Sequence, residues 1–296
     1  MVENVTKKKS NPFSKIKNFF IDPKTHKVSK ENITKVLAKF YMYFILLLMY
    51  APIIILIIFS FTESNELGWT GFSFGLYGKL FQNTKLMTAV GNTLLIAVVS
   101  AVVSTILGTL GAIGTFYASR KYKKVVETMT QLPVVNAEIV MALSLAVVFK
   151  TINTSYTFLT LLIGHVVLTV AFVYLNVKPK LAQMDPNTYE AALDLGATPM
   201  QGLFKVILPE IIPGILSGFL ISITLSLDDF VITQYLKEPS FETISTYIQK
   251  IVTKHPIPAE VRALTTIIFL VVLAFVVGIT IYNNKKANKV AKARRK

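Results

Sequence analysis

Six long apolar runs constrain this chain more than any other feature of its sequence. Each has about twenty residues or more, the length that an α-helix needs to cross the hydrocarbon core of a bilayer. Because the backbone must satisfy its own hydrogen bonds in lipid, such runs are expected to be helical. We therefore predict an all-α membrane protein with six transmembrane helices, over Phe40 to Phe61, Ala89 to Tyr117, Thr128 to Phe149, Ser155 to Val177, Ile211 to Leu236 and Leu264 to Tyr282.

Positive charge sets the expected orientation. Most of the 31 Lys and Arg residues lie in segments that fall on one side of the membrane if the N-terminus is cytoplasmic, and cytoplasmic loops are enriched in these residues. We expect both termini in the cytoplasm, with a six-helix domain over residues 40–283 in the cell (plasma or inner) membrane and a basic tail over 284–296. The basic extension over residues 1–39 either lies at the membrane interface or only fixes the orientation. Because the basic residues lie at the ends and between the spans, the net charge of +15 indicates contact with membrane lipid and not with nucleic acid.

A short polar segment, residues 185–209, lies between the fourth and fifth spans, on the predicted cytoplasmic side. Asp185 followed by proline is typical of a helix start, and Gly196 readily adopts the left-handed conformation that ends a helix. Thr198, with a glutamine three residues later, predicts a capping box that starts a second helix. Pro209 predicts the end of that helix, because proline lacks the N–H that a helix interior needs. We expect a helix, a glycine elbow and a second helix lying flat at the membrane surface.

Three acidic residues fall inside the predicted spans: Glu138 in the third, and Asp228 and Asp229 in the fifth. A charge near the bilayer centre costs on the order of 2.5–3.5 kcal/mol on insertion scales, so it normally faces a cavity or a partner. Because the six spans contain no Lys or Arg, the three carboxylates are protonated, pair with another subunit, or line a watery path for a cation. The alternatives are a structural hydrogen bond for Glu138 and simple solvation for the two aspartates.

The depth of these acids follows from the helical rise. In continuous helices, Glu138 lies near the midplane and the aspartate pair lies nearer the outer mouth. Such a spread suits an elongated polycation better than one compact site does.

Other classes of chemistry lack the residues that they need. The chain has no cysteine, and its three histidines are scattered, so neither a disulfide framework nor a metal site is expected. His165, within the fourth span, is expected to hydrogen-bond to a neighbouring helix; a ligand role is the alternative. No G-x-x-x-x-G-K-[ST] motif occurs, so ATP is expected on another chain.

The polar loop resembles a known motif. Its spacing is similar to the EAA motif of importer-type ABC permeases at six positions: Glu190, Ala191, Ala192, Gly196, Leu208 and Pro209. Together with Ser226 to Ile232 in the fifth span, the chain resembles the spermidine/putrescine permease group, in particular its second permease. It departs from that group's pattern at Ala137, which stands where proline is usual before the acid, and at Ser245, which also replaces a proline.

This resemblance implies a type I ABC importer permease (MetI-like) fold whose cytoplasmic coupling helices contact an ATPase. It also implies a non-enzymatic subunit that forms half of a polyamine import pathway and carries no cofactor of its own. The implied partners are a second, distinct permease, two copies of a cytoplasmic ATPase that binds the ATP, and an extracellular or periplasmic polyamine-binding protein. The alternatives are an ABC permease for iron, thiamine, phosphonate or sulfate, and a secondary carrier that uses Glu138 for proton coupling.

Overall fold

The protein is helical wherever its structure is described. The computed structural model describes residues 30–62, 71–253 and 259–293, and these parts contain helices and connections but no strand. The chain divides into two compact units, Met1–Tyr77 with Ala259–Lys296, and Gly78–Pro258. Most of the predicted basic extension over 1–39 lies outside the described residues.

The first unit contains the helices at the two ends of the described chain, α2 (Lys30–Phe59) and α13 (Ala259–Ala293). The two helices contact each other, and the guanidinium of Arg262 donates to the carbonyl oxygen of Phe59 at 3.5 Å. From Thr34 onwards the most apolar part of α2 is not buried by the rest of the chain, as expected of a helix that faces lipid or another subunit. The short helix α3 (Gly75–Gln82) leads into the second unit.

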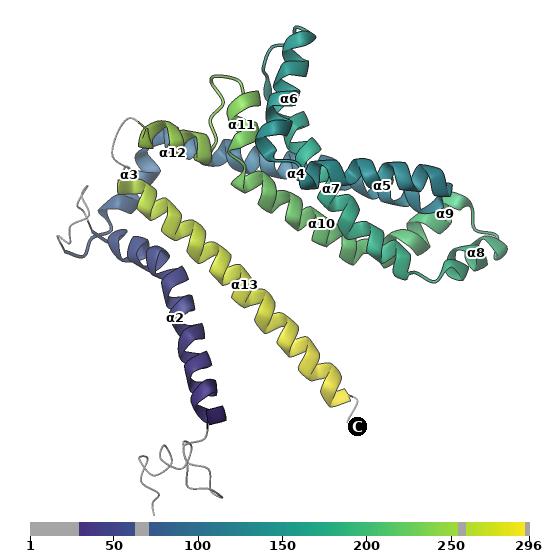
Figure 1. Cartoon of the computed structure of the whole chain (residues 1–296), viewed down its shortest axis with the longest axis horizontal. Coiled ribbons are helices and arrows are strands. Elements are labelled where there is room, and N and C mark those ends of the chain that lie inside the picture. The colour runs from purple at the N-terminus through teal and green to yellow at the C-terminus, as the bar shows by residue number, and fades with distance from the viewer. Residues whose placement is uncertain (1–29, 63–70, 254–258, 294–296) are drawn as a thin grey trace, which may run out of the picture. The chain divides into compact units, whose positions relative to one another are not determined.

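Three long helices form the core of the second unit: α4 (Thr84–Tyr117), α7 (Phe158–Gln183) and α10 (Leu208–Asp228), which pack side by side (Figure 1). Two glycines allow this close approach. A Cβ on Gly108 of α4 would lie 2.7 Å from the Cβ of Val173, and one on Gly218 of α10 would lie 3.0 Å from the Cα of the same valine. Small residues at contacts are how helices associate tightly in a bilayer, where apolar surface alone gives no preference for protein over lipid.

This packing gives a first prediction. Gly108→Ala is expected to lower the thermal unfolding temperature of the purified protein, because overpacking a tight contact costs about 1–3 kcal/mol. Gly114→Ala is the matched control on the same helix, since a Cβ there meets nothing within 4 Å. Equal unfolding temperatures for the two variants would contradict the packing of α4 on Val173.

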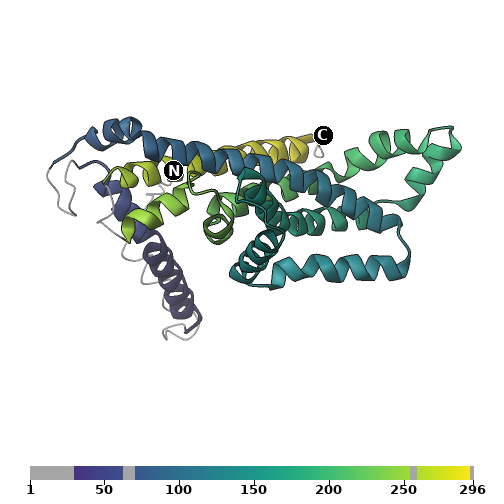
Figure 2. The same ribbon diagram turned by 90° about the horizontal axis from the view of Figure 1, so that it is seen from above.

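The third predicted span is broken. Instead of one helix over residues 128–149, the structure has α5 (Arg120–Val135) and α6 (Glu138–Thr151), bent by 108° at the break (Figures 1 and 2). Asn136 and Ala137 adopt extended conformations, with ψ of 145° and 135°. Pro133, just before the break, lacks an N–H and so weakens the last turn of α5. The predicted continuous helix is therefore wrong.

The fifth predicted span is broken in the same way. Helix α10 ends at Asp228, Asp229 is extended with ψ of 130°, and a short helix α11 (Val231–Leu236) follows. Helices α6 and α11 pack against each other and share one apolar cluster with α4 and α7. A further helix, α12 (Ile244–Val252), begins with a capping box at Thr243.

The predicted helix end at Pro209 is also wrong. From Pro199 the chain stays helical to Asp228, through α9 (Pro199–Gly202), a π-helical turn η1 (Leu203–Ile207) and α10. In the π turn the N–H of Leu208 donates to the carbonyl oxygen of Leu203, five residues earlier. This wider turn accommodates the proline ring, which would clash with the preceding turn of a regular α-helix.

Several described helices could cross a membrane. By length and composition these are Thr34–Phe59, Thr84–Tyr117, Phe158–Gln183 and Pro199–Asp228, with the bent pair α5–α6 as a fifth if it counts as one span. The sixth predicted span, 264–282, lies within α13. The structure thus shows a helical protein with four or five apolar spans by these criteria, and the count of six stays a prediction.

Candidate functional site

The polar loop folds as the helix, elbow and helix that its caps predict. Helix α8 (Pro186–Asp194) begins where the carboxylate of Asp185 accepts the N–H of Asn187 at 3.0 Å. Two residues after its last residue, Asp194, the helix is terminated by Gly196, whose φ of +87° lies in the left-handed region. There the N–H of Gly196 donates to the carbonyl oxygen of Leu193, and the N–H of Ala197 to that of Ala192. This is the Schellman arrangement, which satisfies the last carbonyl groups of a helix and favours glycine. The capping box of Thr198 and Gln201 on α9 is present as well.

The ring of Tyr189 connects the two helices of the elbow with the end of α4. The ring of Tyr189 on α8 lies against Gly202 so closely that a Cβ there would come within 2.7 Å of it. The same ring lies 5.7 Å, between centroids, from that of Tyr117 at the end of α4. Helices α8 and α9 therefore hold a defined position at one end of the α4, α7 and α10 layer (Figure 1).

The elbow exposes apolar side chains beside its acidic residue. The side chains of Leu195, Met200 and Phe204 are 89%, 61% and 58% exposed, and Glu190 is exposed as well. Of the six motif residues, Glu190, Ala191, Gly196 and Pro209 are exposed, whereas Ala192 and Leu208 are half-buried. The exposed apolar side chains beside Glu190 are suited to binding in a groove of another protein.

The three acidic residues lie at the two helix breaks. Glu138 is the first residue of α6 and Asp228 is the last of α10. Asp229 is the extended residue that follows α10, two positions before α11. Glu138 and Asp228 are exposed, whereas Asp229 is only 4% exposed. The Glu138 carboxyl interacts electrostatically with both aspartates. The predicted depths assumed continuous helices, which the structure does not have. The two breaks lie near each other, because Ile139 and Phe230 line the same cavity, and Glu138, Asp228 and Asp229 are called the acidic group below.

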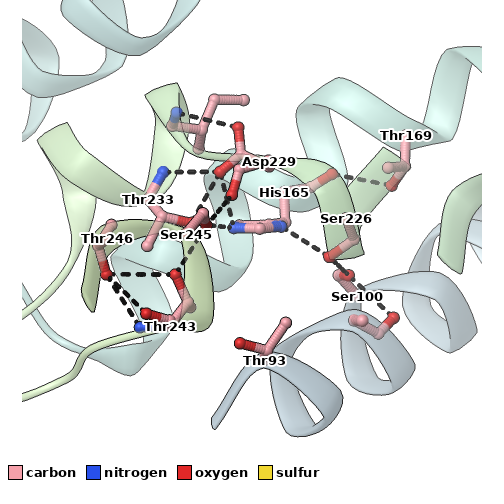
Figure 3. Close-up of polar contacts among 12 residues, drawn as sticks. Thr93, Ser100, His165, Thr169, Ser226, Asp229, Thr233, Thr243, Ser245 and Thr246 are labelled. Atoms are coloured by element: carbon pink, nitrogen blue, oxygen red, sulfur yellow. Dashed lines mark hydrogen bonds and ion pairs between the residues drawn. The ribbon is translucent and has the colours of Figure 1, made fainter. Parts of the chain in front are cut away.

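Asp229 also has a structural role. Its carboxylate accepts the N–H of Ile232 at 3.1 Å, the N–H of Thr233 at 2.9 Å and the hydroxyl of Thr233 at 2.7 Å (Figure 3). These bonds satisfy the first donors of α11, as an N-cap residue does. Asp229 thus starts α11, while Asp228 and Glu138 leave their carboxylates exposed.

His165 is hydrogen-bonded to neighbouring helices, as predicted. Its imidazole contacts Ser226 of α10 at 2.7 Å and Thr233 of α11 at 3.0 Å. No group of three or more His, Cys, Asp or Glu residues suited to a metal occurs in the part of the chain that is described.

A cavity of about 540 Å³ adjoins the acidic group. It includes Ile139 and Phe230, the residues that follow Glu138 and Asp229, and extends between α11 and α12. Its polar lining consists of Gln234, Tyr235, Lys237, Glu242, Thr246, Gln249, Lys250 and Thr253. Glu242 and Lys250 form an ion pair, so this cavity presents both charges and is distinct in character from the acidic group itself.

The two candidate sites are at opposite ends of α10. Leu208 and Pro209 belong to its first turn and Asp228 is its last residue. Twenty-one helical residues at the α-helical rise separate the ends by about 30 Å, the thickness of the hydrocarbon core. A single helix therefore connects the projecting elbow with the acidic group.

The sequence is similar to known membrane transport proteins. Residues 104–286 match the family described as binding-protein-dependent transport system inner membrane component. The spermidine/putrescine transport system permease protein PotC of Haemophilus influenzae is 36% identical over 238 residues, which cover 80% of this chain and 92% of that protein. The putrescine transport system permease protein PotI of Escherichia coli strain K12 is 34% identical over 232 residues, covering 74% and 81%.

Solved structures support the fold. A chain of a bacterial ABC transporter that imports the acidic polysaccharide alginate aligns with a TM-score of 0.67 at 16% identity, covering 86% of this chain and 98% of that one. A chain from a bacterial alginate ABC transporter in complex with a periplasmic protein aligns with a TM-score of 0.64 at 22% identity, covering 82% and 91%. At these identities the likeness concerns the fold alone.

Proposed function

The chain belongs to the family of binding-protein-dependent transport system inner membrane components, and from that membership we propose that it is a permease subunit of an ATP-driven polyamine importer. The polyamine class is supported by the two relatives named for spermidine and putrescine transport, which are 36% and 34% identical over most of this chain. Two of the alternative substrates, sulfate and phosphonate, are anions and would be repelled by the exposed carboxylates of Glu138 and Asp228. The observation that carries the proposal is the grouping of three acids at two helix breaks within the apolar spans.

The acidic group would serve the cationic substrate. Glu138 and Asp228 are exposed and can each approach an ammonium group, while Asp229 behind them adds a third negative charge. Broken helices at membrane depth are tolerated where they line a cavity, and transporters use them to form substrate sites. Such a group compensates the charge of a polyamine that leaves water, which lowers the barrier to its passage.

The elbow would couple the permease to its ATPase. In this proposal α8 and α9 are coupling helices, and the exposed Leu195, Met200 and Phe204 enter a groove of the ATPase beside Glu190. The positive-inside pattern supports a cytoplasmic position for this loop and for both termini. Closure of two ATP-bound ATPase subunits would move the loop, and α10 would transmit that movement to the helix break at Asp228.

A complete importer needs further chains. Six spans in this chain would form half of the pathway, and a second, distinct permease would form the other half. A binding protein outside the membrane would deliver the polyamine. ATP would bind to the ATPase subunits, so this chain needs no cofactor.

Reconstituted transport tests the proposal. The tagged chain is co-expressed with the ATPase, second permease and binding protein of its own system, and the purified assembly is placed in proteoliposomes. We expect ATP-dependent uptake of radiolabelled spermidine or putrescine. Unlabelled polyamines should compete with this uptake, whereas thiamine, ferric iron and sulfate should not. Uptake driven by a proton gradient without ATP would instead establish the secondary carrier. Binding of thiamine or iron, and no polyamine, by the purified binding protein would overturn the substrate class.

A further inference from the structure

His165 links the two sides of the α10–α11 break. One ring nitrogen, Nδ1, lies 2.7 Å from the hydroxyl of Ser226, in the last turn of α10. The other, Nε2, lies 3.0 Å from the hydroxyl of Thr233 on α11 and 3.5 Å from the carboxylate of Asp229. The imidazole itself is fully buried and belongs to α7, so a third helix holds the break together (Figure 3).

The hydrogen bonds around this ring connect four helices, α4, α7, α10 and α11. The hydroxyl of Thr233 donates to Asp229, so its oxygen accepts the hydrogen on Nε2 of His165. On the other side of the ring, the hydroxyl of Ser226 contacts both Nδ1 of His165 and the hydroxyl of Ser100 on α4, which lies 3.0 Å away. Each ring nitrogen thus has a hydroxyl partner, and the contacts lead through Thr233 to the carboxylate of Asp229.

The residues of this network lie on both sides of Asp228 in the sequence. Ser226 fixes the chain two residues before it, and the carboxylate of Asp229, the next residue, is fixed by the start of α11. The carbonyl oxygen of Asp229 also accepts the hydroxyl of Ser245 on α12 at 2.8 Å. The backbone on both sides of Asp228 is thus held by side chains of α7, α11 and α12, although the Asp228 carboxylate itself is exposed.

We infer that His165 is a positioning residue that fixes the α10–α11 break and thereby places the carboxylate of Asp228 in the substrate path. The inference rests on the proposed function for its transport consequence, but the geometric part concerns the break alone. Buried polar networks of this kind hold one arrangement firmly when every member has a partner.

A double-mutant cycle tests the transport consequence in the reconstituted importer. His165→Ala is expected to raise the polyamine concentration for half-maximal uptake about tenfold when Asp228 is present, and to have no further effect in Asp228→Asn, because coupled residues are not additive. His165→Gln keeps a donor near Thr233 and His165→Asn keeps a group near Ser226, so each should show a smaller increase than alanine. The inference would be overturned if His165→Ala raised the polyamine concentration for half-maximal uptake equally with Asp228 and with Asn at position 228. It would also be overturned if His165→Ala lowered the amount of protein and left that concentration unchanged.

Thiol labelling tests the geometry without transport. Because the chain has no cysteine, Asp228→Cys gives a single thiol whose rate of reaction with a charged methanethiosulfonate reagent reports its exposure. In nanodiscs, adding His165→Ala should change this rate several-fold, whereas the rate at Lys121→Cys, on the exposed start of α5, should not change. An unchanged rate at position 228 would overturn the positioning role.

The two measurements separate the inference from the proposed function. If Asp228→Asn leaves half-saturation unchanged, the cation path is wrong. A labelling change at position 228 would still show that His165 places that residue.

Discussion

Gly196→Glu is expected to leave the chain inserted in the membrane and to abolish uptake. Gly196 has a φ of +87°, and a non-glycine residue in the left-handed region costs roughly 1–2 kcal/mol. This strain alone does not stop transport. A Cβ at this position meets no described residue of the chain within 4 Å, so the glutamate side chain would project from the elbow into the space that the ATPase groove is proposed to occupy.

Gly196→Ala is the matched control, because it imposes the same backbone strain with almost no bulk and no charge. We expect partial uptake for alanine and none for glutamate, at equal amounts of protein in the membrane. Co-purification with the ATPase should be lost in parallel with uptake. Normal uptake by Gly196→Glu would show that this loop does not couple the permease to ATP hydrolysis.

The elbow illustrates what sequence can predict. Asp185, Gly196 and Thr198 act through hydrogen bonds to residues a few positions away, so their effect is local and visible in the sequence. Pro209 was misinterpreted for the opposite reason. Its missing N–H predicts a helix end, but one π-helical turn accommodates the ring, and the packing of α10 on α7 and α4 keeps the chain helical.

The breaks at residues 136–137 and 229 could not be predicted from apolar character. The hydrophobic signal of a span is the same for a straight helix and for two helices at 108°. Local signals were present, since Pro133 lies before the first break, and Asp229, an N-cap residue type, lies two residues before α11. The choice between continuing and breaking depends on the contacts of α6 with α11, which join residues almost a hundred positions apart.

The three members of the acidic group can be predicted from residue type, but their arrangement cannot be predicted from a model of continuous helices. Intramembrane acids are conspicuous in any apolar span, so Glu138, Asp228 and Asp229 were found directly. Their grouping, and the division between exposed Asp228 and buried Asp229, follow from the breaks. His165 was correctly expected to be hydrogen-bonded, but its bonds on both sides of a break required the fold.

Replacing both exposed acids, in Glu138→Gln with Asp228→Asn, is expected to raise the polyamine concentration for half-maximal uptake by at least about a hundredfold. A unit charge 4 Å from an ammonium contributes up to about 4 kcal/mol at an effective dielectric constant of 20. Desolvation offsets much of this. A net loss of about 1.4 kcal/mol per carboxylate corresponds to tenfold in affinity for each. Uptake of radiolabelled spermidine across a concentration series in proteoliposomes measures the shift.

Asp229→Asn separates binding from structure, because its carboxylate accepts three hydrogen bonds at the start of α11. Its amide can replace only part of these acceptors, and bonds to a charged group are worth about 1.5–3 kcal/mol each. We therefore expect a lower thermal unfolding temperature and less protein in the membrane, with a smaller change in half-saturation than Asp228→Asn causes. If Asp229→Asn instead raised half-saturation as strongly and left stability unchanged, then Asp229 would contact the substrate itself, and the cap would be secondary.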